Sequence, residues 1–204
     1  MRKCIAALAV ITFAIILAAC SRLGGHDAYG EIYKRYNSLK SFRAAAEITV
    51  RNDRTENVYS VRQVYAAPDR FAMTVEKPSE IAGCGYVFRG GEVLLKSGLG
   101  ESESFRDVFS DERSAVLLTD FFEEYYKSED SYVETLAEKN PAETVMSCFL
   151  SGKNKNRFSQ TLWIDNRTFL PIRLETYDSD GNMTVRVEYR EFEGNCDTKE
   201  SDFE

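Results

Sequence analysis

MTVRVEYRE, residues 183–191, alternates apolar and charged side chains more regularly than any other part of the chain. In a β-strand successive side chains point to opposite faces, so a period of two places the apolar residues together on one side. The segment therefore predicts a strand with one buried face and one wet face.

The same period of two recurs through most of the chain. Pairs such as Asn52-Asp53, Pro68-Asp69 and Gly90-Gly91 separate the alternating runs and are typical of turns. The predicted strands cover residues 44–50, 58–65, 71–76, 84–89, 92–96, part of 98–107, 132–137, 144–150, 158–165, 172–177 and 183–191. The pattern indicates about ten antiparallel strands.

Helical spacing appears twice. Residues 28–41 carry an apolar stripe formed by Tyr29, Ile32, Tyr33, Tyr36 and Leu39. A second stripe, with Asp111 or Ser114 available as a cap, is formed by Val116, Leu117, Leu118, Phe121, Phe122 and Tyr125. Together with the strands, these helices predict an α+β fold: a strongly curved antiparallel sheet, or incomplete β-barrel, with helices covering its concave side.

The N-terminus has the layout of an export signal. Arg2 and Lys3 precede sixteen uncharged residues, which as a helix would cover about 24 Å, less than the roughly 30 Å of a bilayer core. Leu17-Ala18-Ala19-Cys20 resembles a bacterial lipobox, which implies cleavage before Cys20 and attachment of fatty acids such as palmitate to its thiol. A plain signal peptide is the alternative.

We accordingly expect four segments: a signal at 1–19, a lipidated cysteine and tether at 20–27, a folded domain at 28–195 and an acidic tail at 196–204. The tail is expected to be loose, although Phe203 is able to pack back. The lipid anchor would hold the domain on the extracytoplasmic face of the cell membrane.

Charge and residue types exclude several functions. The whole chain has a net charge of −7, and loss of the two basic signal residues makes the mature part −9, which argues against a nucleic-acid partner. His26 is the only histidine and lies in the tether, so histidine-based catalysis and histidine metal sites are not expected. We predict no enzyme activity, no cofactor and no metal; a carboxylate hydrolase is a weaker alternative.

Two smaller features allow more than one interpretation. Three cysteines, Cys84, Cys148 and Cys196, remain in the folded part, and they permit either a Cys84–Cys148 disulfide or no disulfide. Asp178, Asp180 and Asn182 resemble the start of a calcium loop, but Gly181 lies at the wrong position, so a hairpin turn is expected there.

The order of elements resembles the lipoprotein-carrier family of LolA and LolB. The matching marks are QVYAAPDRF at 63–71, LWID at 162–165 followed by Pro171, and Asp180-Gly181 leading to Tyr189, Phe192 and Asn195. This resemblance implies an incomplete barrel that receives acyl chains. Two differences argue against a soluble carrier that shuttles lipoproteins. Ala67 stands where such carriers have a basic residue, and such carriers lack a lipobox.

The chain also resembles the GerS germination lipoproteins of spore-forming clostridia, which implies binding of a spore-cortex amidase. The apolar side chains have two interpretations, since they form either packed core or the wall of an acyl-binding cavity. The candidate cavity residues are Tyr36, Leu118, Phe122, Phe71, Met73 and Trp163. An open cavity would favour a lipid ligand, whereas a cavity filled by its own side chains would favour a protein partner.

Overall fold

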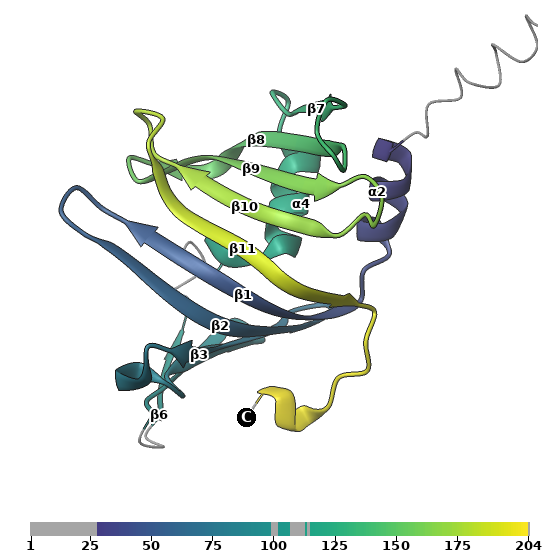
Figure 1. Cartoon of the computed structure of the whole chain (residues 1–204). Coiled ribbons are helices and arrows are strands. Elements are labelled where there is room, and N and C mark those ends of the chain that lie inside the picture. Colours follow the sequence, from purple (N-terminus) through teal and green to yellow (C-terminus); the bar gives the residue numbers. More distant parts are fainter. Residues whose placement is uncertain (1–27, 99–101, 107–112, 114, 204) are drawn as a thin grey trace, which may run out of the picture.

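A single open sheet of eleven antiparallel strands forms the body of the protein in the computed structural model (Figure 1). The structure describes residues 28–98, 102–106, 113 and 115–203. The predicted signal peptide, Cys20, the tether and both proposed caps, Asp111 and Ser114, lie outside these residues. The α+β architecture with a curved, unclosed sheet is confirmed.

The strands follow the predicted segments closely, and the segment 98–107 supplies one of them. Their bounds are β1 Ser41–Arg51, β2 Glu56–Ala66, β3 Arg70–Lys77, β4 Gly85–Arg89, β5 Glu92–Lys96, β6 Ser102–Arg106, β7 Tyr132–Leu136, β8 Glu143–Asn154, β9 Arg157–Asp165, β10 Pro171–Tyr177 and β11 Met183–Gly194. Gly90 and Gly91, with φ of 58° and 80°, form the tight turn between β4 and β5, as the glycine pair predicted.

Two meanders make up the sheet. The spatial order is β6-β5-β4-β3-β2-β1-β11-β10-β9-β8-β7, so β1–β6 form one arm, β7–β11 form the other, and β6 and β7 are the two edges. The arms join where β1 pairs with β11, from Phe42 opposite Gly194 to Val50 opposite Val185, with an irregularity at Ala45/Ala46. The segment 183–191 thus lies at the centre of the sheet.

Besides short helical turns, the described residues include two α-helices, α2 (Ala28–Asn37) and α4 (Leu118–Lys127). Neither reaches the length and apolarity that a membrane crossing needs. Helix α2 ends at Asn37, before the predicted Ser41, where the Ser38 hydroxyl donates to the carbonyls of Lys34 and Arg35 at 2.8 and 3.2 Å. Three residues later the Lys40 amide donates to Asn195 at 2.8 Å, and β1 begins at Ser41. Helix α4 belongs to the connection between the two edge strands, so its segment has to cross from one arm to the other.

The core lies between α4 and the inner, concave face of the sheet. One apolar cluster combines α4 residues with side chains of both arms, which shows that the helix is enclosed by the curvature of the sheet. Fully buried members of this cluster are Ile32, Phe42, Phe71, Leu117, Leu118, Phe121, Met146, Leu162, Ile164, Leu174 and Val187. The expected covering of the concave side by a helix is therefore observed for α4.

A second, small apolar cluster lies on the outer face of the β1–β6 arm. Val64, Ala66, Ala72 and Val87 point away from α4 and are covered by Phe203, which is 4% exposed. The short 3-10 helix η2 (Glu200–Phe203) carries this ring. The C-terminal segment is thus docked through Phe203 rather than loose.

Ion pairs reinforce the docking of η2. Arg43 binds Asp202 at 2.7 Å, while Arg70 and Arg89 bind Glu200 at 2.9 and 2.5 Å. The acidic side chains of the tail therefore serve as partners for arginines on the outer face of the sheet.

The optional Cys84–Cys148 disulfide is wrong, because all three described cysteines are free. Cys84 precedes β4 and Cys148 lies on β8, strands that belong to different arms of the sheet. The Cys84 sulfur accepts a hydrogen bond from the Gly98 amide at 3.3 Å, and Cys148 packs in the core with 2% exposure.

Candidate functional site

Four of the six candidate cavity residues are packed as core. The rings of Tyr36 on α2 and Phe122 on α4 stack at a centroid distance of 4.4 Å. Leu118 has no exposed surface and Phe71 is 1% exposed. Met73 is half-buried at the margin of the same cluster. These side chains fill the space between helix and sheet with one another.

Tyr36 also fixes α2 to the sheet. Its hydroxyl donates a hydrogen bond at 3.0 Å to the carbonyl of Phe169, in the loop between β9 and β10. Burial raises the pKa of Tyr36 well above its usual range, so the phenol stays neutral. A neutral, hydrogen-bonded phenol of this kind is a structural anchor.

Trp163 does not join the other candidates, and the structure places it on the outer face. Its strand neighbours Leu162 and Ile164 are fully buried on the inner face, so Trp163 between them points outward. The guanidinium of Arg173 lies 3.9 Å from the centre of its ring. The period of two at residues 162–164 already predicted that Trp163 points outward, between two inward residues. Its aromatic ring alone was a misleading reason to place it in the cavity wall.

Buried polar side chains on the inner face were missed by the sequence reasoning. Gln63 on β2 donates to the carbonyl of Val116 at 3.3 Å, and Thr176 on β10 donates to the carbonyl of Ala115 at 3.4 Å. Gln160 on β9 donates to the Thr176 hydroxyl at 3.0 Å. Both arms therefore bind the backbone that leads into α4. The signal was present, because these polar residues occupy inward positions of their strands.

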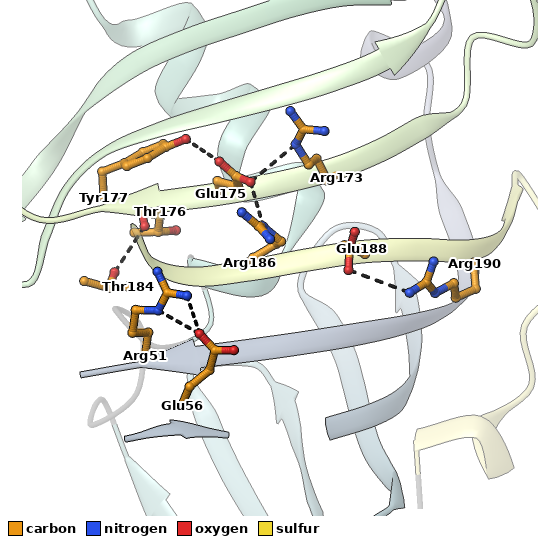
Figure 2. Close-up of polar contacts among 10 residues, drawn as sticks. All are labelled: Arg51, Glu56, Arg173, Glu175, Thr176, Tyr177, Thr184, Arg186, Glu188 and Arg190. Atoms are coloured by element: carbon orange, nitrogen blue, oxygen red, sulfur yellow. Dashed lines mark hydrogen bonds and ion pairs between the residues drawn. The ribbon is translucent and has the colours of Figure 1, made fainter. Parts of the chain in front are cut away.

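The outer face of the β7–β11 arm, called the second arm below, carries a polar network centred on Glu175 (Figure 2). The Glu175 side chain is 7% exposed and lies against Arg186 on β11 at 2.7 Å and Arg173 at 3.3 Å. Tyr177 donates its hydroxyl to the same carboxylate. Residues 173, 175 and 177 share one face of β10, and Arg186 lies directly opposite Glu175 in the ladder.

Two exposed aromatic side chains extend this face toward the β7 edge. Tyr132 on β7 is 58% exposed and pairs with Ser147, while Phe149, two residues further along β8, is 42% exposed. The rings of Phe149 and Phe158 meet edge to face at 5.4 Å, with the Lys153 ammonium 5.0 Å from the Phe158 ring. Aromatic residues and arginines together are the composition of protein–protein interfaces.

A pocket of about 670 Å³ opens at the end of the half-barrel that lies away from α2, where the tips of three hairpins meet (Figure 1). Its walls come from the β1–β2, β8–β9 and β10–β11 hairpins and include Arg51, Asn52, Asn154, Arg157, Asp178 and Val185. Most of these groups are polar or charged, so the pocket suits a polar ligand better than an acyl chain.

Two carboxylates, Asp53 and Asp178, line this pocket. Within the described residues no group of three or more His, Cys, Asp and Glu side chains could hold a metal ion. Asp178 accepts hydrogen bonds from the backbone of Asp180 and Asn182 at 2.9 and 2.7 Å, and Gly181 has a φ of 83°. The hydrogen bond from the Asn182 side-chain amide, followed by those from the backbone, lowers the pKa of Asp178, which forms the turn of the β10–β11 hairpin, as expected.

Three carboxylates on the alternating strands, Glu47, Glu76 and Glu188, lie on the outer face of the sheet. Glu47 and Glu188 are cross-strand neighbours, and Arg190 lies 3.6 and 3.7 Å from them. Glu76 pairs with Arg62 at 2.5 Å. Their charges are compensated at the surface.

An open antiparallel sheet that curves around one helix, with its first and last strands paired at the centre, is a half-barrel, the fold that the resemblance to LolA implied. The chain belongs to the YdcC-like sporulation protein family, whose family model matches residues 1–203. Sporulation protein YdcC of Bacillus subtilis (strain 168) is 22% identical over 183 residues, which are 89% of this chain and 53% of that protein. The chain thus spans about half the length of the curated relative that it matches.

Two solved structures agree on the fold. An uncharacterized conserved protein from Thermus thermophilus superimposes with a TM-score of 0.55 and 14% identity, covering 87% of this chain and 93% of that one. A chain in the structure of the CwlD amidase from Clostridioides difficile in complex with the GerS lipoprotein gives 0.51 and 21%, covering 83% and 95%. A LolA superfamily protein from Nitrosomonas europaea has a lower TM-score of 0.48 and 12% identity, covering 86% and 96%.

Proposed function

We propose that this chain is a membrane-anchored, non-catalytic protein that acts by binding another protein of the cell envelope, and that its half-barrel does not carry an acyl chain. The observation that carries this proposal is the filled inner face. Leu118 and Phe121 have no exposed surface, and the stacked rings of Tyr36 and Phe122 fill the space between α2 and α4. Opening this space would require separating α4 from the sheet.

The cost of such an opening is large. Exposing one fully buried Leu or Phe side chain costs about 1.5–3 kcal/mol. Helix α4 contributes four buried side chains, Leu118, Phe121, Phe122 and Tyr125, so moving it away would cost roughly 6–12 kcal/mol before any ligand gain. A whole domain is stable by only about 5–15 kcal/mol, so this helix is a poor candidate for a lid.

The outer face of the second arm is the surface that we assign to the partner. Tyr132 and Phe149 are exposed on it, on the same face as the Arg173–Trp163 pair. The family is named for sporulation, and one neighbour in fold comes from a complex between an amidase and a lipoprotein. A cell-wall amidase of the CwlD kind is therefore the first partner to test, with Cys20 as the lipid anchor on the extracytoplasmic side.

The test is affinity capture of the full-length protein from envelope membranes, combined with lipid extraction and mass spectrometry. We expect a captured partner protein in nearly the same molar amount as this chain. We also expect acyl groups on Cys20 and no further bound lipid. The double variant Tyr132→Ala/Phe149→Ala should lose the partner. Val58→Ala is the matched control, because Val58 is 47% exposed on β2, in the other arm.

Two results would contradict the proposal. One is a stoichiometric lipid that is not attached to Cys20, which would restore the carrier function. The other is capture that Tyr132→Ala/Phe149→Ala leaves unchanged, which would remove the partner from this face.

A further inference from the structure

Three exposed tyrosines lie together where α2 meets the end of α4. Tyr29 and Tyr33 on α2 are 37% and 43% exposed, and Tyr126 on α4 is 40% exposed. The rings of Tyr33 and Tyr126 meet edge to face at 5.4 Å. We call Tyr29, Tyr33 and Tyr126 the tyrosine patch.

The patch is rigidly supported from beneath. The ring of Tyr126 lies 5.7 Å from that of Tyr125 and 6.1 Å from that of Phe122, both of which are core residues. Tyr29 is hydrogen-bonded to the Tyr125 hydroxyl. The rings are therefore held in place, and binding through them would cost little side-chain entropy.

The patch lies next to the point where the chain leaves the described domain toward Cys20. Helix α2 begins at Ala28, and eight residues from Cys20 to Asp27 reach at most about 28 Å when fully extended. A domain of this size is roughly 40 Å across, from a radius of gyration of about 16 Å. A lipid anchor at Cys20 would thus keep the α2 end close to the membrane surface.

The charges beside the patch are mutually compensated. Glu31 pairs with Lys34 at 2.9 Å on α2, and Glu123 pairs with Lys127 at 3.5 Å on α4. The chain as a whole is acidic and gains nothing from anionic lipid, so attraction at this end has to come from the aromatic rings. Tyrosine is enriched at membrane interfaces because its ring is apolar and its hydroxyl is wet.

From this placement we propose that the tyrosine patch rests among the lipid headgroups of the membrane that holds Cys20, and so orients the domain with α2 toward the lipid. The proposal rests on the lipid anchor of the proposed function. The hairpin tips and their pocket lie at the end of the sheet away from α2 and would face away from the membrane (Figure 1). A weak contact is sufficient here, because the tether makes docking intramolecular.

The single tryptophan of the chain makes the test direct. Trp163 lies two residues before β9 ends beside α2, so the control is the double variant Trp163→Phe/Val58→Trp, which carries the reporter near the tip of the β1–β2 hairpin, away from α2. The double variant Trp163→Phe/Tyr33→Trp moves the only reporter into the patch. Both full-length, acylated proteins are reconstituted in phosphatidylcholine vesicles whose lipids carry bromine near the headgroup end of the acyl chains.

We expect the bromolipid to quench the Tyr33→Trp emission and to leave the Val58→Trp emission unchanged. Adding Tyr29→Ser and Tyr126→Ser should reduce quenching to the level of the control. Because the contact is aromatic, high salt should not release it.

Each other outcome overturns the inference. Equal quenching of both reporters, or quenching that persists without Tyr29 and Tyr126, removes the role of the patch. Loss of the captured protein partner in the serine variants would assign the patch to that partner. An unmodified Cys20 in the mass spectrum removes the anchor as well, and this readout is separate from the fluorescence.

Discussion

Truncation of Phe121 to alanine is the sharpest test of a filled half-barrel. Phe121 has no exposed surface and contacts the rings of Phe122 and Tyr125 at centroid distances of 5.4 and 5.9 Å. Phe→Ala changes in packed cores cost about 3–5 kcal/mol. For a domain of 150–250 residues each kcal/mol lowers Tm by about 2–4 °C, so Phe121→Ala should lower it by roughly 6–20 °C.

Phe149→Ala is the matched control, since it removes the same side chain from an exposed position. Phe149 is 42% exposed on the outer face, and surface changes of this kind usually alter stability by only about 0.5 kcal/mol. Both variants would be compared with wild type by urea unfolding and by thermal melting.

Ligand rescue gives a second readout. The cavity left by Phe121→Ala should bind benzene, which raises Tm of the variant only, as engineered apolar cavities do. If Phe121→Ala cost no more than Phe149→Ala, or if benzene or a fatty acid raised Tm of wild type, the space under α4 would already be open. The reasoning that excludes an acyl chain would then be refuted.

Three further predictions concern single side chains. Burial raises the pKa of Asp120 to about 6 despite its ion pair with Arg113, so its stabilising effect is full below about pH 4 and is lost as pH rises to 6. The free energy of unfolding in urea should therefore be roughly 1–3 kcal/mol higher for Asp120→Asn than for wild type at pH 7.5. Near pH 3.5 the two free energies should be equal. Burial raises the pKa of Cys148 to about 12, so iodoacetamide at pH 8 should leave Cys148 unmodified in the folded protein and modify it in urea, as read by peptide mass spectrometry. Phe203→Ala should cost about 3–5 kcal/mol and speed amide hydrogen exchange in β3 and β4, whereas unchanged exchange would mean that η2 is not part of the fold.

The periodic parts of the fold were predictable from the sequence. Strict alternation at 183–191 and the glycine pair at 90–91 report local geometry, so β11 and the β4–β5 turn follow from them directly. The hydrogen bond that fixes the segment between α2 and β1 was not predictable, because the Lys40 amide binds Asn195, 155 residues away. Local patterns carry no record of such distant partners.

The candidate site was predictable only in part. Helical spacing identified Tyr36, Leu118 and Phe122 as inward residues, and the structure brings them together. The same spacing could not distinguish packed core from cavity wall, since both need apolar side chains. The docking of α4 through Gln63 and Thr176 depends on pairing between strands that are far apart in the sequence.

The pairing of β1 with β11 also governs when the chain can fold. Ser41 binds Cys196 across a separation of 155 residues, so the central ladder needs nearly the whole polypeptide before it can form. Contacts of such high sequence separation slow folding and leave unpaired strands exposed in the meantime. A chain that crosses a membrane N-terminus first would therefore emerge with half a sheet and need protection until its last strand arrives.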